Sequence, residues 1–276
     1  MAHISWEKSV KGGTLGGMRI VVCVKHVPDV QAERVLGDEG FLVRGDDDVL
    51  NELDENAVQE SVDLAGGDGE VIALTMGPED AVDGLRRALA LGADRAIHVC
   101  DDRAAGSDVL GTARVLAAAI RQLGEEAPID LVVTGMAALD GMTATIPSAL
   151  AAHLDLPALT LAKTVELTGT VLRITRTMGF SDEVLEADLP AILSVTDQAN
   201  EVRYPNFKAI MAAKKKPIDE IDLDDLGLGD GLVGAAGAGT RVTNAVERPP
   251  RDAGEVHNDS GDGGRRLADY ILGVMK

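Results

Sequence analysis

A chain of 276 residues has room for one large domain, or for one domain with appendages. Its net charge of −20 argues against broad binding to nucleic acid or to an anionic membrane, because phosphate contacts need Lys and Arg gathered on one face. Aromatic residues make up only 2% of the chain, so its core must be built mainly from Ala, Val, Leu and Ile.

The start of the chain and its two cysteines bear on where the protein works. Residues 1–17 have no apolar signal core, and Met18 stands directly before the first strand-like run, so we interpret them as a vector leader or an upstream extension. No run of 18 apolar residues occurs, so no membrane span is expected. Cys23 and Cys100 lie in apolar runs and are expected to be reduced core thiols, which favours a cytoplasmic location.

From Met18 to Pro157 the hydrophobic pattern alternates between short apolar runs and segments with helical spacing. Short continuous apolar runs are typical of strands buried on both faces of a sheet. The expected strands are residues 19–24, 70–76, 95–100 and 129–135. The expected helices are residues 51–65, 79–91, 106–123 and 147–154. This alternation predicts an α/β fold with a doubly wound, mostly parallel sheet.

After Pro157 the pattern changes. Residues 161–178 form two alternating segments around Thr168-Gly169, which predicts a hairpin. Residues 185–196 then predict a final strand that follows a Pro-containing turn.

The last part of the chain has a composition of its own. Residues 229–262 are rich in Gly, Ala, Asp and Pro without any period, which indicates an extended arm. Residues 265–276 regain helical spacing and predict a terminal amphipathic helix, which could dock on its own domain or on a partner. We therefore expect a domain over residues 18–228 and an arm with a helix over residues 229–276.

Ligands of an open parallel sheet bind at the carboxyl ends of its strands, which directs attention to three loops. These are residues 25–30, 76–79 and 135–146, none of which is a Walker A or a GxGxxG motif. In the third loop Gly141 allows close backbone approach, Thr145 offers a hydroxyl, and a helix start supplies free N–H groups that attract phosphate. An ordinary strand-to-helix loop would have the same composition, so both interpretations stay open.

Sets of residues typical of catalysis are missing. The sequence has no HExxH, CxxC, GxSxG or EF-hand loop. His26 stands at a strand end and could be a base, although a core or surface role is more typical of a lone histidine. The acidic run 45–56 could hold a cation, but we interpret it as a solvated helix start, where acidic side chains favour the helix dipole. We therefore expect a chain without bond-making chemistry of its own.

Several segments together resemble one family. They are "RIVVCVKHVPD", "LNELDENAVQES" and "LPAILSVTDQANEVRYPNFKAIMAAKKKP", in this order, and they are similar to the beta subunit of electron transfer flavoprotein as it occurs in high-GC Gram-positive bacteria. The resemblance implies an adenine-nucleotide alpha-hydrolase-like fold and a heterodimer with an alpha subunit that holds most of the FAD. It also implies electron transfer from flavin dehydrogenases, such as the acyl-CoA dehydrogenases of fatty acid beta-oxidation, to a quinone oxidoreductase. The terminal arm and helix would pack on the alpha subunit.

The resemblance further implies that the chain buries one AMP, whose place a second FAD takes in a bifurcating branch of the family. Carried over by position, the nucleotide site consists of Cys23, Val24, Asn51, Met76, Ala138, Gly141, Ala144, Thr145 and Ile146. The usual Asn-Gln-Thr triplet of the AMP loop is Ala144-Thr145-Ile146 here, so backbone N–H groups would have to carry more of the phosphate binding. The run 140–144 is closer to the Asp-Gly-x-Thr-Ala of the bifurcating branch.

The resemblance also assigns a role to residues 197–217, which gather scarce aromatic and basic side chains. It implies a docking loop for partner dehydrogenases, with Phe207 as the apolar anchor and with Arg203, Tyr204 and Lys208 beside it. Val30 and Leu53 would line the FAD as apolar wall. Two other functions stay open, a subunit of a bifurcating flavoprotein and a stand-alone nucleotide-binding regulatory domain.

Overall fold

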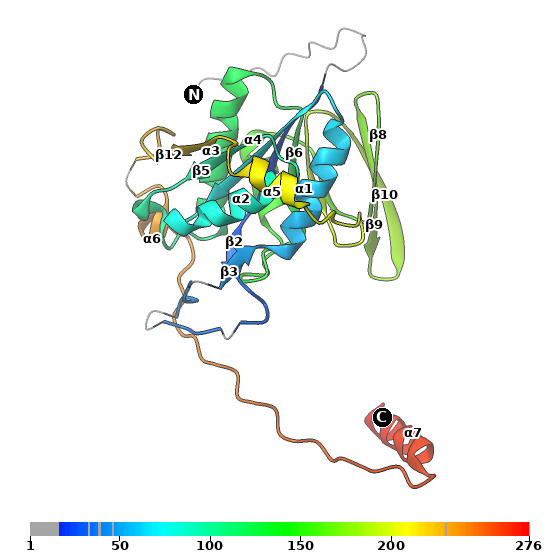
Figure 1. Ribbon diagram of the computed structural model, residues 1–276. Coiled ribbons are helices and arrows are strands. Elements are labelled where there is room, and N and C mark those ends of the chain that lie inside the picture. Colours follow the sequence, from blue (N-terminus) through cyan, green and yellow to red (C-terminus); the bar gives the residue numbers. More distant parts are fainter. Residues whose placement is uncertain (1–16, 33, 38–39, 46, 230, 276) are drawn as a thin grey trace. The chain divides into compact units, whose positions relative to one another are not determined.

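The computed structural model describes residues 17–275 except 33, 38, 39, 46 and 230 (Figure 1). The chain forms two compact units, with the boundary between Thr243 and Asn244. The expected leader, residues 1–17, lies outside the described residues apart from Gly17. No helix in the described part of the chain has both the length and the apolar character that a membrane span needs.

A parallel sheet of seven strands forms the centre of the first unit, in the order β12-β5-β4-β1-β6-β11-β7. Its strands are β1 (Arg19–Cys23), β4 (Glu70–Met76), β5 (Arg95–Val99), β6 (Leu131–Gly135), β7 (Ala158–Ala162), β11 (Ala191–Val195) and β12 (Ile218–Ile221). The chain builds outward from β1 through β4 to β5, and then continues on the other side of β1 with β6. This reversal of strand order between β1 and β6 confirms the expected doubly wound fold.

Helices cover both faces of the sheet and create two apolar cores. The covering helices are α1 (Glu52–Ala65) and α2 (Val82–Leu91) on one face, and α3 (Val109–Glu126) and α4 (Ile146–Leu154) on the other (Figure 1). Because successive side chains of a strand point to opposite faces, Ile20 and Val22 of β1 join the core under α1 and α2. Val21 and Cys23 join the core under α3 and α4. A strand buried on both sides explains the continuous apolar run that the sequence shows.

Shorter elements surround the main sheet. β2 (His26–Pro28) and β3 (Asp48–Leu50) form a two-stranded antiparallel ribbon directly after β1, which the sequence did not indicate. Two 3-10 turns span Glu79–Ala81 and Asp102–Ala104, and two short helices are α5 (Phe207–Ala213) and α6 (Gly234–Gly237). Helix α5 packs on α2.

The predicted hairpin is part of a larger antiparallel sheet. Its strands are β8 (Thr164–Thr168), β9 (Val171–Met178) and β10 (Ser181–Asp188), in the order β10-β9-β8. Strands β8 and β9 confirm the hairpin, but residues 185–188, expected to begin the last strand of the main sheet, belong to β10 instead. Strands β9 and β10 contact the edge strand β7 of the main sheet.

The arm expected from residue 229 onward begins with a docked segment. Val233 is buried, the backbone N–H of Ala235 donates to the carbonyl of Ala105 at 2.9 Å, and the N–H groups of Gly239 and Thr240 donate to the Asp108 carboxylate. The first compact unit therefore extends to Thr243. The second unit contains the extended arm and the terminal helix α7 (Gly263–Val274), both as expected.

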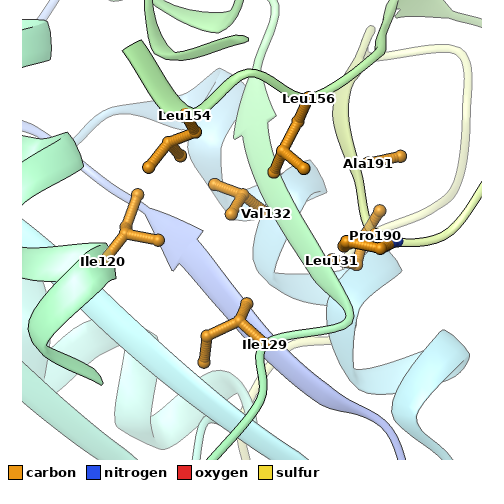
Figure 2. A pocket seen from close by; sticks show the side chains of 8 residues that line it. All are labelled: Ile120, Ile129, Leu131, Val132, Leu154, Leu156, Pro190 and Ala191. Atoms are coloured by element: carbon orange, nitrogen blue, oxygen red, sulfur yellow. The ribbon is translucent and has the colours of Figure 1, made fainter. Parts of the chain in front are cut away.

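An apolar crevice lies under α3 and α4 at the amino ends of β6 and β11 (Figure 2). Its lining consists of Ile120, Ile129, Leu131, Val132, Leu154, Leu156, Pro190 and Ala191. The space does not admit a water-sized sphere, and it offers no charged side chain. It is a feature of core packing, at the opposite end of the strands from the loops considered below.

Candidate functional site

The carboxyl ends of β1 and β6 mark the point where neighbouring connections leave the sheet in opposite directions. After β1 the chain passes through the β2–β3 ribbon to α1 on one face, and after β6 it passes to α4 on the other. Such a point leaves a crevice that binds ligands in open α/β sheets. Loops 25–30, 76–79 and 135–146, which the sequence indicated, follow β1, β4 and β6 as expected.

Asn51 ties two of these loops together. Its backbone N–H donates to the Lys25 carbonyl at 2.9 Å. Its side-chain Nδ2 donates to the Ala137 carbonyl at 2.9 Å, and its Oδ1 accepts from the Leu139 N–H at 3.1 Å. The side chain is fully buried. The resemblance places Asn51 at the nucleotide site, and in this structure both ends of its amide hold the loop after β6.

Asp54 lies beneath the same loops and is buried. The backbone N–H of Lys25 donates to its Oδ2 at 2.9 Å. A Cβ on Gly135 would lie 2.4 Å from its Oδ1 and 2.6 Å from the Leu53 carbonyl oxygen, so only glycine fits at the end of β6. The acidic run was expected to be a solvated helix start, and for Asp54 that expectation is wrong, because the helix it begins packs directly on β1 and β6.

Burial dominates the electrostatics at this end of β1. It raises the pKa of Asp54 to about 7, although hydrogen bonds from Asn51 and from the Lys25 backbone partly oppose the shift. Burial, reinforced by the Asp54 charge, raises the pKa of Cys23 to about 12. Cys23 is therefore an unreactive thiol that contributes to packing, as the sequence indicated.

An ion cluster lies at the carboxyl ends of β1 and β6. Lys25 Nζ and Arg44 both contact Asp140 Oδ2, at 2.7 Å and 3.0 Å. Burial alone would raise the pKa of Asp140, but the charges of Lys25 and Arg44 hold it below its ordinary value. The cluster fixes the loop after β6 to the connection between β2 and β3.

Beyond this cluster, residues 141–145 form an exposed turn that leads into α4. Met142 and Ala144 have positive φ angles of 49° and 50°, which non-glycine residues rarely adopt. Within the described part of the chain, the N–H groups of residues 143–146 have no hydrogen-bond partner. The Thr145 hydroxyl donates to the Thr143 carbonyl at 2.7 Å. A run of backbone donors at a helix start fits a phosphate group, with little help from side chains.

The remaining residues expected at the nucleotide site follow the sheet. Val24 is buried at the end of β1, and Met76 is half-buried at the end of β4, the neighbouring strand. Val30 is exposed between β2 and β3, and Leu53 is half-buried in the first turn of α1. Asn51 binds the residues on either side of Ala138, whereas Cys23 points into the core under α3 and α4. Gly141, Ala144, Thr145 and Ile146 belong to the exposed turn and the start of α4.

The sequence did not indicate the basic and acidic residues that connect the loops at this site. They are Lys25, Arg44, Asp54 and Asp140. Asp54 follows Asn51 by three residues, and Lys25 follows the first strand directly. For Lys25 the sequence did contain a signal. A charged residue that directly follows a buried strand stands at the carboxyl end of the sheet, where ligands bind.

A second candidate site is the segment around Phe207. Phe207 and Tyr204 have 77% and 91% of their surface exposed. The expected docking loop contains helix α5, whose first turn is capped by Asn206, since its Oδ1 accepts from the Ala209 N–H at 2.9 Å. Arg203 anchors the segment to α1, because its side chain contacts Asp63 at 2.8 Å and its N–H donates to Gln59. The aromatic side chains are therefore presented from a fixed base.

The lysines of this segment divide into two groups. Lys216 is half-buried, and its Nζ donates to the carbonyls of Leu89 and Ala93 at the end of α2. It therefore caps a helix. Lys208, Lys214 and Lys215 are exposed and could face a partner.

Comparisons with known proteins give one consistent result. The model of the electron transfer flavoprotein domain matches residues 40–226, more than half of the chain. The electron transfer flavoprotein subunit beta of Mycobacterium leprae is 40% identical over 261 residues, which cover 92% of this chain and 97% of that protein. The subunit beta of Clostridium acetobutylicum is 34% identical, covering 94% and 98%. Subunit CarD of the caffeyl-CoA reductase-Etf complex from Acetobacterium woodii is 33% identical over 242 residues, covering 87% and 91%.

Proposed function

The chain belongs to the electron transfer flavoprotein beta-subunit family, and from that premise we propose that it is the non-catalytic subunit of a cytoplasmic electron carrier. It pairs with an alpha subunit that holds most of one FAD. The heterodimer accepts electrons from flavin dehydrogenases, including acyl-CoA dehydrogenases, and passes them to a quinone oxidoreductase. The exposed apolar face of α7, which includes Leu267, Tyr270 and Ile271, packs on the alpha subunit.

The single observation that carries this proposal is the exposure of Tyr204 and Phe207 on a segment that Arg203 connects to α1. Two of the six aromatic residues of the chain stand there, largely in solvent. Large apolar side chains of this kind dominate the energetics of protein interfaces when they enter a pocket on a partner. Exposed Lys208 and Lys214 beside them suit an acidic partner surface and would increase the association rate more than the affinity.

The FAD supplies the redox chemistry when it is bound, and the residues of this chain exclude water and position it. Val30 and Leu53 would form an apolar wall beside the ring system. Neither side chain carries a proton donor or acceptor. The contribution of this chain to the flavin is therefore shape and low polarity, which agrees with a non-catalytic role.

We further propose that the crevice between β1 and β6 holds AMP. The N–H groups of residues 143–146 would bind its phosphate, and the ends of β1 and β4 would contact its base through Val24 and Met76. Asn51 would act on the nucleotide indirectly, by holding the Ala137–Leu139 backbone in place. Lys25 would act indirectly as well, because its ion pair with Asp140 holds the start of the exposed turn in place.

A second candidate is a bifurcating flavoprotein, in which a second FAD occupies the same crevice. Two observations favour it. The loop after β6 reads Asp140-Gly141-Met142-Thr143-Ala144, and the relatives include a subunit of a caffeyl-CoA reductase-Etf complex. The exposed turn 141–145 leaves the crevice open to solvent on this side, where a larger nucleotide could extend.

Quantifying the nucleotides of the purified heterodimer tests these proposals together. The chain is co-expressed with its alpha subunit, the complex is purified and denatured, and the released FAD and AMP are measured against protein. One FAD and one AMP per heterodimer are expected. Two FAD molecules would replace the AMP proposal with the bifurcating one, and a complex that forms without any flavin would contradict the electron-carrier function.

A further inference from the structure

A cluster of three potential metal ligands lies beside the nucleotide crevice, in side chains that the AMP proposal does not use. One ring nitrogen of His26 and one carboxylate oxygen each of Asp48 and Asp80 lie within 4.8 Å of one another. We propose that these three side chains bind a divalent transition-metal ion, with Zn²⁺ as the best match. The inference does not depend on the proposed function, because it involves neither the nucleotide nor Phe207.

The fold brings these residues together from three elements. In the β2–β3 ribbon His26 pairs with Leu50 and Pro28 pairs with Asp48, so His26 and Asp48 are diagonal neighbours on one face of the ribbon. Asp80 belongs to the 3-10 turn that precedes α2. A Cβ on Gly84, one turn further along α2, would lie 3.4 Å from Cδ2 of His26, so the imidazole packs directly against this helix. The ligands thus connect the ribbon to the start of α2.

A second observation points to a ligand, namely the unsatisfied state of His26. Only 7% of its surface is exposed, and its Nε2 is buried without a hydrogen-bond partner among the described residues. Buried polar atoms in native structures nearly always have a partner, and leaving one without a partner costs stability. Coordination of a metal ion by Nε2 itself would supply the missing interaction.

The negative charge of Asp48 is also only partly offset by its neighbours. Its side chain is 2% exposed, and among the described residues its hydrogen-bond and ion-pair partners are the Gly45 N–H at 3.2 Å and Arg44 at 3.5 Å. Arg44 lies closer to Asp140, at 3.0 Å, and shares its charge between the two carboxylates. A buried carboxylate with weak partners favours a nearby cation.

The donor set selects the class of ion. Imidazole is a good ligand for zinc and similar transition metals, whereas magnesium and calcium prefer oxygen ligands alone. Ligand atoms around tetrahedral zinc are about 3.4 Å apart, so donors that lie within 4.8 Å of one another need to approach by at most about 1.4 Å. Asp80 is exposed on a turn and can make this movement. Water would complete the coordination, because the chain supplies three ligands.

Metal titrations of the full-length chain test the proposal, with Asp80→Asn as the main variant. Asp83→Asn is the matched control, since Asp83 is also exposed at the start of α2 but does not belong to the cluster. Because Asp80 is exposed, its replacement should leave the fold intact, which circular dichroism checks. Calorimetry should show one Zn²⁺ bound per chain, an affinity at least about tenfold lower in Asp80→Asn, and no change in Asp83→Asn.

Cobalt provides a readout of the ligands themselves. Co²⁺ bound to the wild-type chain should give visible absorption bands that change in Asp80→Asn and not in the control. Equal Zn²⁺ binding by the wild-type chain and Asp80→Asn would overturn the proposal, as would the absence of a stoichiometric Zn²⁺ site. Equally tight binding of Mg²⁺ or Ca²⁺ would also overturn it, because such an ion would not use the imidazole.

Discussion

The crevice between β1 and β6 and the segment around Phe207 use their side chains in opposite ways. In the crevice, Asn51 and Asp54 are buried and direct their polar atoms to the backbone of neighbouring loops. In the docking segment, Tyr204 and Phe207 are exposed on a base that other residues hold in place. Buried hydrogen bonds hold the first region together, whereas the second region exposes apolar side chains that another protein can contact. Substitutions should therefore change stability in the first region and rates of electron transfer in the second.

The largest expected effect on stability concerns the pH dependence that Asp54 introduces. Its pKa is about 7 in the folded chain and 3.8 when unperturbed, so between these values the folded chain binds a proton that the unfolded chain has lost. Asp54 therefore adds its full contribution to the free energy of unfolding when the pH is below 3.8. This contribution decreases at higher pH and is lost once the pH has risen through about 7. Asp54→Asn should remove this loss.

Urea unfolding of wild type and Asp54→Asn at several pH values checks this expectation. Between about pH 5 and about pH 8, the stability of the variant relative to wild type should rise by about 3 kcal/mol. The Asn side chain keeps an oxygen that can accept from the Lys25 N–H. Parallel pH profiles for the two proteins would mean that Asp54 is not buried as a protonated acid.

The next effect concerns the close approach at Gly135. In Gly135→Ala the new Cβ would meet the Asp54 carboxylate at 2.4 Å, so α1 and β6 would have to separate. We expect a loss of about 2 kcal/mol or more in the free energy of unfolding. Gly141→Ala is the matched control, because nothing lies within 4 Å of its added Cβ. Equal stability of the two variants would show that α1 and the end of β6 are less tightly packed than described.

A smaller effect separates the lysines at the base of the docking segment. Lys216→Met removes the ammonium group that caps the end of α2, and it should cost about 1 kcal/mol in thermal or urea unfolding. Lys215→Met changes the same charge at an exposed position and should leave stability within about 0.5 kcal/mol of wild type. If both variants unfold like the wild type, Lys216 belongs with the surface lysines instead.

The sequence predicts those parts of the fold in which local pattern and burial agree. β1, β4, β5 and β6 are buried on both faces, and their apolar runs are visible without any structure. β12 and β10 were missed, because the first is an edge strand with two acidic residues and the second has no buried side chain. The three-residue strands β2 and β3 are too short for any period to be detected.

The candidate site could be located from the sequence but its interior could not. The loops at the carboxyl ends of the strands follow from the α/β pattern of the sequence. The burial of Asp54 and the ion pairs of Asp140 depend on residues far apart in the chain. An acidic residue in the first turn of a helix is usually solvated, so its local pattern gives no sign of burial. Helix α5 was missed because Pro205 and the lysine run suggest a loop.

The central claim, that Phe207 makes contact with electron-donating dehydrogenases, is tested most directly by the rate of flavin reduction. Reduction of the heterodimer by an acyl-CoA dehydrogenase is followed by stopped-flow absorbance for wild type, Phe207→Ala and Phe180→Ala. Phe180 is a matched control, because it is fully exposed in the turn between β9 and β10. Phe207→Ala should lower the second-order rate constant about 30-fold, with FAD content unchanged, while Phe180→Ala stays within about twofold of wild type. Wild-type rates in Phe207→Ala, or an equal loss in both variants, would contradict the account.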